Sequence, residues 1–140
     1  MQQQVPQLRF ATTRLGSGPR VHYAEQGDPS GEPIVFLPAY TDSWFSYSRV
    51  LPLLPARYHA YALDQRGHGD SEHAPLYQWE ADIRDALAVF DSVTTDPVPV
   101  IGHSKGGSLM SQLAASMPGR PRSKVAPCST PSSTSGRRAF

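Results

Sequence analysis

Cysteine and long hydrophobic runs are scarce in this sequence. The one cysteine, Cys128, cannot form an intramolecular disulfide, and no second Cys or His at ligand spacing accompanies it. Nowhere do about 18 apolar residues follow one another, as a membrane-spanning helix requires. Residues 1–25 also lack the apolar core of a signal peptide. We therefore expect a soluble, cytoplasmic protein with no membrane partner, no metal and no cofactor.

Acidic residues are absent from the last part of the chain. Residues 119–140 hold five Lys and Arg but no Asp or Glu, whereas residues 1–118 hold eight Lys and Arg and all 12 acids. The net charge of +1 thus combines an acidic body with a basic tail, and it gives no reason to expect a nucleic-acid partner. Few large apolar residues lie in this Ser-, Thr- and Pro-rich tail. We expect 1–118 to fold and 119–140 to be disordered.

Short apolar runs predict β-strands. Residues 8–12 and 21–25 alternate around a Gly-rich turn, which predicts a hairpin. Residues 34–37, 59–64 and 98–101 are continuous apolar runs, typical of strands that are covered on both faces.

Apolar spacing predicts helices after three of these strands. Residues 42–54 indicate a helix with Asp42 or Ser43 as N-cap, ended by prolines. Residues 79–93 show the clearest helical period, and a turn and helix occupy 102–117. The polar residues expected mostly on the solvent face of the 79–93 helix are Glu80, Asp82, Arg84, Asp85 and Asp91.

The order strand, loop, helix therefore recurs three times. This order indicates an α/β fold with a mostly parallel sheet and helices on both faces. Pro99 has no N–H to donate to a sheet, so the strand that contains it either lies at an edge or leaves one carbonyl unpaired.

The segment Gly102-His103-Ser104-Lys105-Gly106 matches the pattern G-x-S-x-G. An apolar strand leads into it and a helix follows, so the serine lies in a sharp turn that projects its hydroxyl above the sheet. The helix N-terminus also favours developing negative charge. Ser104 is thus a candidate nucleophile, and the alternative is a serine that only caps a helix.

A second segment, residues 64–71 (Asp-Gln-Arg-Gly-His-Gly-Asp-Ser), resembles the D-x-R-G-x-G-x-S loop of α/β-hydrolases. It precedes Ser104 by about 40 residues, as in that family. The resemblance covers residues 8–117 and implies the N-terminal half of the fold, about five of its roughly eight strands.

The resemblance also implies roles for individual residues. Ser104 resembles the nucleophile of the Ser…Asp/Glu…His triad, and the oxyanion hole would use the backbone N–H of Lys105 and that of Tyr40 or Ala39. Pro38 and Ala39 replace the usual His and Gly, and a positive φ at Ala39 would cost about 1–2 kcal/mol. Residues that would support the turn and the loop are Gly102, His103, Gly106, Asp64, Arg66, Gly67, His68 and Gly69.

No Asp, Glu or His follows Ser104 in these 140 residues. The triad's acid and base are therefore missing, and His68 is a disfavoured substitute because no acid partner for it is evident. We expect a truncated, inactive relative of a serine hydrolase. The alternative is a non-catalytic binding protein that uses the half-sheet, with self-association through its open edge.

The resemblance implies a small ester-like substrate. Epoxide chemistry is disfavoured, because relatives that open epoxides usually carry Asp at the position of Ser104. The substrate itself stays open.

Overall fold

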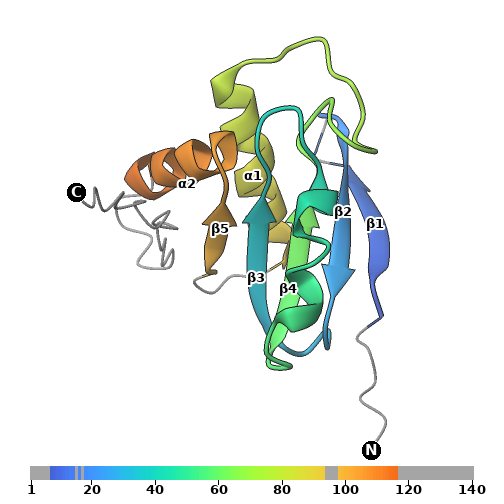
Figure 1. Cartoon of the computed structure of the whole chain (residues 1–140). Coiled ribbons are helices and arrows are strands. Elements are labelled where there is room, and N and C mark those ends of the chain that lie inside the picture. Colours follow the sequence, from blue (N-terminus) through green and yellow to red (C-terminus); the bar gives the residue numbers. More distant parts are fainter. Residues whose placement is uncertain (1–6, 15, 17, 94–97, 117–140) are drawn as a thin grey trace, which may run out of the picture.

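The computed structural model describes residues 7–14, 16, 18–93 and 98–116. These residues form one five-stranded sheet in the order β1-β2-β4-β3-β5 (Figure 1). The five strands lie where the apolar runs predicted them. They are β1 (Arg9–Arg14), β2 (Arg20–Gln26), β3 (Glu32–Leu37), β4 (Tyr58–Leu63) and β5 (Val100–Gly102).

The sheet is mixed, so the expectation of a mostly parallel sheet is wrong. Strand β2 is antiparallel to both β1 and β4, and only the pairs β3/β4 and β3/β5 are parallel. The short connection between β1 and β2 leaves no room for a crossover, so these strands must be antiparallel. Helical crossovers set the direction of the remaining strands only.

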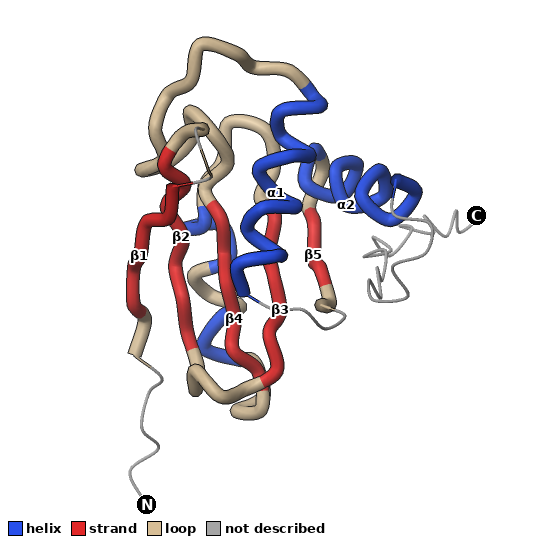
Figure 2. Tube along the Cα trace, turned by 180° about the vertical axis from the view of Figure 1, so that it is seen from behind, coloured by secondary structure: helices blue, strands red, loops and turns tan. Residues whose placement is uncertain are grey.

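Both α-helices lie on one face of the sheet (Figure 2). Helix α1 (Trp79–Val93) has the predicted bounds, and α2 (Lys105–Ser116) follows β5 directly. Val89 from α1 and Leu109 from α2 are 1% exposed and pack with β3 and β4 residues in one cluster. These two helices therefore supply one half of the core.

The opposite face is covered by two short 3₁₀ helices, η1 (Trp44–Tyr47) and η2 (Leu51–Leu53). The continuous helix expected over residues 42–54 is therefore wrong. Ser43 does cap η1, because its Oγ accepts the N–H of Phe45 at 3.3 Å. Pro52 lies at the start of η2, where its missing N–H is tolerated, and η1 has already ended at Tyr47.

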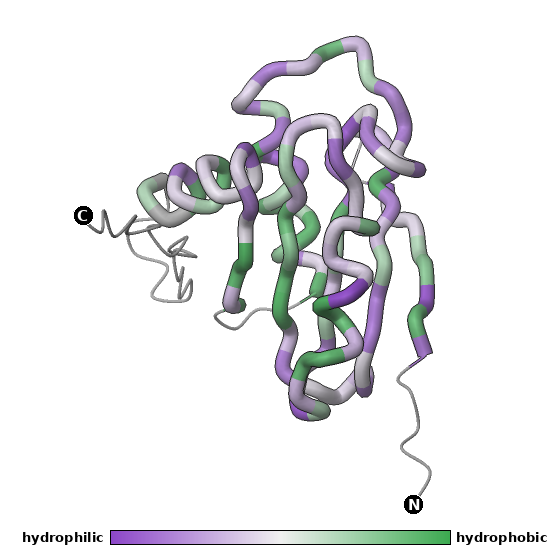
Figure 3. The backbone as a smooth tube through the Cα atoms, in the orientation of Figure 1, coloured by the Kyte–Doolittle hydropathy of each residue, from purple (hydrophilic) through white to green (hydrophobic). Residues whose placement is uncertain are grey.

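Strand β3 is buried on both faces, as its continuous apolar run predicted. Ile34 and Phe36 pack with the 3₁₀ helices, whereas Val35 and Leu37 pack with α1 and α2. Figure 3 shows this strand as the apolar centre of the sheet. The carboxyl end of β3 is thus held rigidly beside that of β5, where the candidate site lies.

Strand β5 lies at the edge of the sheet, one of the two alternatives that Pro99 left open. Pro99 directly precedes β5, and its carbonyl accepts the N–H of Val35 at 3.0 Å. Its missing N–H therefore lies on the β3 side, and the ladder between β3 and β5 begins only after Pro99. Residues 119–140, including Cys128, fall outside the described part of the chain. No helix within that part has the length and apolar character to cross a membrane.

Candidate functional site

The turn between β5 and α2 places Ser104 in a strained conformation. Ser104 has φ +53°, a left-handed value that is uncommon outside glycine. Its carbonyl accepts the N–H of Ser108 at 3.0 Å, and the preceding N–H, of His103, is donated to the Leu37 carbonyl at 3.2 Å. Both side chains, His103 and Ser104, are exposed. The surrounding bonds hold a conformation that would cost roughly 1–2 kcal/mol by itself.

The two glycines of the motif are required by close backbone contacts. A Cβ on Gly102 would lie 2.4 Å from the carbonyl carbon of Gly106. One on Gly106 would lie 2.1 Å from the Leu37 carbonyl oxygen, at the end of β3. Any side chain at either position would separate the turn from the sheet.

The predicted oxyanion donors lie at neighbouring strand ends. Lys105 is the first residue of α2, and no acceptor for its backbone N–H occurs among the described residues, as is usual in a first turn. Tyr40 and Ala39 follow β3, which is parallel to β5. The positive φ of this loop is at Thr41 (+61°) and not at Ala39, so the cost considered for Ala39 does not arise.

The buried side chain of Asp64 stabilises the loop after β4 from inside that loop. Its buried carboxylate accepts the backbone N–H of Trp44 at 2.7 Å and of Asp70 at 3.0 Å, and its Oδ2 lies 2.8 Å from Nδ1 of His22. A Cβ on Gly69 would lie 2.2 Å from the same Oδ2. The carboxylate thus shapes the loop and is turned away from solvent.

Arg66 joins this loop to α1. Its Nε and Nη2 donate to the two carboxylate oxygens of Asp85 at 2.6 and 2.7 Å, and Nη1 donates to the Leu76 carbonyl. These hydrogen bonds to Asp85 raise the pKa of Arg66. Gly67 has φ +70°, and a Cβ there would lie 2.5 Å from the ring of Tyr77.

Two carboxylates expected on the solvent face of α1 instead point inward. Asp82 and Asp85 are three residues apart and therefore lie on the same side of the helix. Asp82 Oδ2 lies 2.8 Å from Nζ of Lys105, and Asp85 contacts Arg66. Their role escaped the sequence analysis because both partners lie outside the helix.

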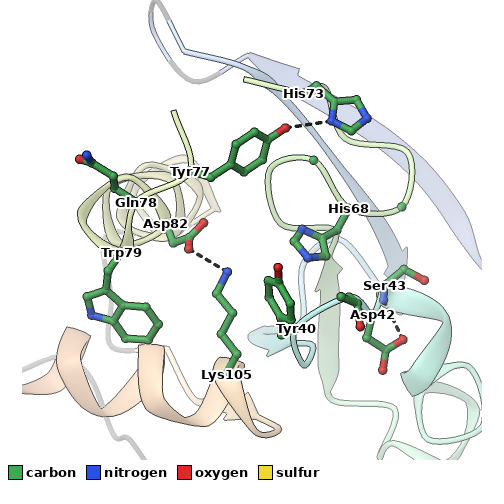
Figure 4. Close-up of a pocket in the computed structure, with 13 residues that line it drawn as sticks. Tyr40, Asp42, Ser43, His68, His73, Tyr77, Gln78, Trp79, Asp82 and Lys105 are labelled. Carbon is green, nitrogen blue, oxygen red and sulfur yellow. Dashed lines mark hydrogen bonds and ion pairs between the residues drawn. The ribbon is translucent and has the colours of Figure 1, made fainter. Parts of the chain in front are cut away.

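A cavity of about 900 Å³ opens between these elements (Figure 4). Of the predicted site residues, it brings together Lys105, Tyr40, His68, Gly67 and Gly69; Ser104 is not among the residues that line it. The additional lining residues are Thr41, Asp42, Ser43, His73, Tyr77, Gln78, Trp79 and Asp82.

His68 lies at the edge of this cavity. Its Nδ1 is 2.8 Å from the Arg66 carbonyl, so this nitrogen donates a hydrogen bond to that oxygen. Its ring meets that of Tyr40 edge-on, with centroids 5.7 Å apart. No contact between His68 and Ser104 occurs in the described residues.

One group of metal-ligating side chains occurs in the described part of the chain: His22, Asp64 and Asp70, with one ligand atom from each within 4.8 Å of the others. Asp64 already accepts hydrogen bonds on both carboxylate oxygens. The side chain of Asp70 is 79% exposed. The arrangement serves loop structure, and no cofactor site is apparent in it.

Comparison with known proteins identifies the family. A family model described as "Alpha/beta hydrolase family" matches residues 34–140. The chain belongs to the α/β-hydrolase family. The soluble epoxide hydrolase of Corynebacterium sp. (strain C12) is 36% identical over 98 residues, which are 66% of this chain and 32% of that protein. A probable serine hydrolase of Drosophila melanogaster is 33% identical over 96 residues, covering 66% and 29%.

Solved structures agree with this membership. An α/β-hydrolase from Novosphingobium aromaticivorans superposes with a TM-score of 0.72 at 27% identity, over 81% of this chain and 41% of that one. An epoxide hydrolase from Vigna radiata gives 0.70 at 28% identity, over 77% and 35%. This α/β-hydrolase chain spans about a third of the length of the curated relatives it matches.

Proposed function

We propose that Ser104 is the nucleophile of a serine hydrolase that cleaves an ester or related acyl compound. The positive φ of Ser104 carries the proposal, because two glycines and the end of β3 hold a non-glycine residue in this conformation. Strain of this kind is concentrated at functional sites. The first turn of α2 places the Lys105 N–H next to the serine, where it would stabilise a developing oxyanion.

The residue type favours acyl transfer over epoxide opening. The relatives named above include epoxide hydrolases and a probable serine hydrolase, so family membership alone does not decide between epoxide opening and acyl transfer. In our proposal the Ser104 oxygen attacks the ester carbonyl and forms an acyl-enzyme. The alcohol leaves with a proton, and water later releases the acid. A carboxylate, the usual nucleophile toward epoxides, is absent at this position.

We further propose that the 140-residue chain by itself turns over slowly. A serine hydroxyl needs a base to take its proton, and no His, Asp or Glu follows Ser104 in the sequence. Binding and oxyanion contacts alone leave roughly 10³–10⁴-fold catalysis over water in triad enzymes that have lost their triad.

Hydrolysis of p-nitrophenyl acetate tests this proposal. Three proteins are compared: the 140-residue chain, its Ser104→Ala variant, and a chimera in which residues 118–140 are replaced by the C-terminal part of the Drosophila relative. We expect the first two near background and the chimera to be active. Ser104→Ala in the chimera should abolish its turnover.

Ser108→Ala is the matched control, because Ser108 lies one turn further along α2. It should leave the chimera active. Fast turnover by the 140-residue chain that Ser104→Ala abolishes would show that an earlier residue, such as His68, acts as base. A chimera that stays active without the Ser104 hydroxyl would refute the nucleophile assignment.

A binding role is the second candidate, favoured by the edge position of β5. Within the described residues β5 pairs with β3 alone, so its other side is free to add a strand. We propose self-association through this edge. Sedimentation of the chain beside Val100→Pro tests it: the substitution would remove the N–H of residue 100 and should lower self-association.

A further inference from the structure

The ammonium group of Lys105 enters the cavity beside the proposed nucleophile. Its Nζ lies 2.8 Å from Asp82 Oδ2 and 5.5 Å from the centre of the Tyr40 ring, and the side chain is 18% exposed. In Figure 4 the lysine extends from the start of α2 toward α1, with Tyr40 and Trp79 on either side. Lys105 thus contributes its backbone to the turn and its charge to the cavity.

The ammonium keeps unused hydrogen-bonding capacity. A lysine head group has three N–H donors. One is directed to Asp82, and the face of Tyr40 attracts the positive charge through its ring electrons. No further acceptor for Nζ occurs among the residues that the structure describes, so at least one donor faces the cavity.

Asp82 holds this donor in place. Its side chain is 9% exposed and lies in the first turn of α1, where the helix dipole favours a negative charge. A largely buried ion pair restricts the lysine more than an exposed one would. The ammonium is therefore positioned in advance of ligand binding.

The charge balance of the cavity indicates which ligand group the donor suits. Asp82 balances Lys105, and Asp42 adds a second carboxylate to the lining. A carboxylate ligand at Nζ would lie beside the carboxylate of Asp82, which already contacts this ammonium. A neutral carbonyl or hydroxyl oxygen can accept from Nζ without that repulsion.

We propose that Lys105 Nζ is a specificity-determining group that binds a neutral carbonyl or hydroxyl oxygen of the substrate beyond the scissile ester. The substrate class is then an oxo- or hydroxy-ester in preference to a plain alkyl ester. This inference rests on the proposed function for its substrate class. The donor itself, its partner and the cavity are independent of the reactivity of Ser104.

Binding of two probes of nearly equal shape tests the inference. Ethyl 3-oxobutanoate and ethyl butanoate differ by one ketone oxygen, and each is titrated into the 140-residue Ser104→Ala chain by NMR. A hydrogen bond to a charged donor predicts roughly tenfold tighter binding of the oxo-ester. The same ligand should shift the Lys105 Nζ protons, whereas ethyl butanoate should not. Equal affinity, or no shift at Nζ, overturns the inference.

Lys105→Met should remove the tenfold preference. Lys124→Met is the matched control, since these are the two lysines of the chain and the second lies outside the described residues. Asp82→Asn should reduce the preference for the oxo-ester, because the Lys105 ammonium would lose its ion-pair partner and be less well positioned. The Nζ shift needs no substitution at Lys105, so the test holds even if Lys105→Met unfolds.

The outcomes separate the two proposals. An oxo-ester preference in a chain whose chimera is inactive would support the role of Lys105 and refute the proposed hydrolase. An active chimera whose 140-residue counterpart shows no preference for the oxo-ester would support the proposed hydrolase and refute the role of Lys105. Tighter binding of monoethyl malonate, which carries a carboxylate, than of the oxo-ester would contradict the inferred neutral ligand.

Discussion

Arg66 and Asp85 form a two-point ion pair between the loop after β4 and helix α1. Arg66 Nε lies 2.6 Å from Oδ2, and Nη2 lies 2.7 Å from Oδ1. The side chains are 9% and 13% exposed, so both charges are largely removed from water. The pair joins two walls of the cavity, one carrying His68 and the other Asp82.

Arg66→Met should destabilise the fold by about 3 kcal/mol, because it leaves the Asp85 carboxylate buried without its partner. Urea unfolding measures the change. Arg84→Met, an exposed arginine on the same helix, should change stability by less than about 0.5 kcal/mol. A similar loss of stability in both variants would mean that the Arg66–Asp85 pair makes no specific contribution to stability.

Gly106→Ala should destabilise the fold by several kcal/mol, while Gly107→Ala should be neutral or stabilise it by up to about 1 kcal/mol. The Cβ at 106 would collide with the Leu37 carbonyl oxygen at 2.1 Å. At 107 the nearest atom is 3.4 Å away, and alanine favours the helix. Thermal unfolding of both variants provides the comparison. Equal melting temperatures would refute the close approach of α2 to β3.

Leu51→Ala should cost about 2–5 kcal/mol, as truncation of a buried leucine does. Leu51, the first residue of η2, is 0% exposed and packs against the sheet, whereas Leu53, two residues later, is 82% exposed. Leu53→Ala is therefore the control and should leave the urea midpoint nearly unchanged. Reversed effects would place the wrong face of η2 against the sheet.

The stability of the chain should fall in acid partly through Glu72. Hydrogen bonds from the Arg20 backbone N–H and side chain hold the pKa of Glu72 below its usual 4.5. The ionised carboxylate is thus favoured in the folded state. Its contribution is present above the unfolded pKa and is lost as pH falls through the lowered folded value.

Glu72→Gln should therefore lose less stability between about pH 5 and 3 than the unsubstituted chain does. Urea unfolding at several pH values measures the slope. Arg20→Met should flatten the slope as well, though less, because the backbone N–H of residue 20 remains. An unchanged slope in Glu72→Gln would contradict the assignment.

Local patterns in the sequence were enough to place most elements. The period of apolar residues located α1 at its observed bounds, and continuous apolar runs located β3, β4 and β5. These patterns work because burial on one helix stripe or on two strand faces demands a fixed spacing. The G-x-S-x-G segment likewise predicted a tight strand-to-helix turn at Ser104, since only small neighbours permit one.

Tertiary structure decided which polar groups meet. Asp82 and Asp85 look like solvent-facing residues of an amphipathic helix, and their partners Lys105 and Arg66 come from other segments of the chain. The left-handed residue after β3 is Thr41, two positions beyond Ala39. Helical period alone cannot show such contacts, because a buried charge is tolerated only where a distant partner is brought to it.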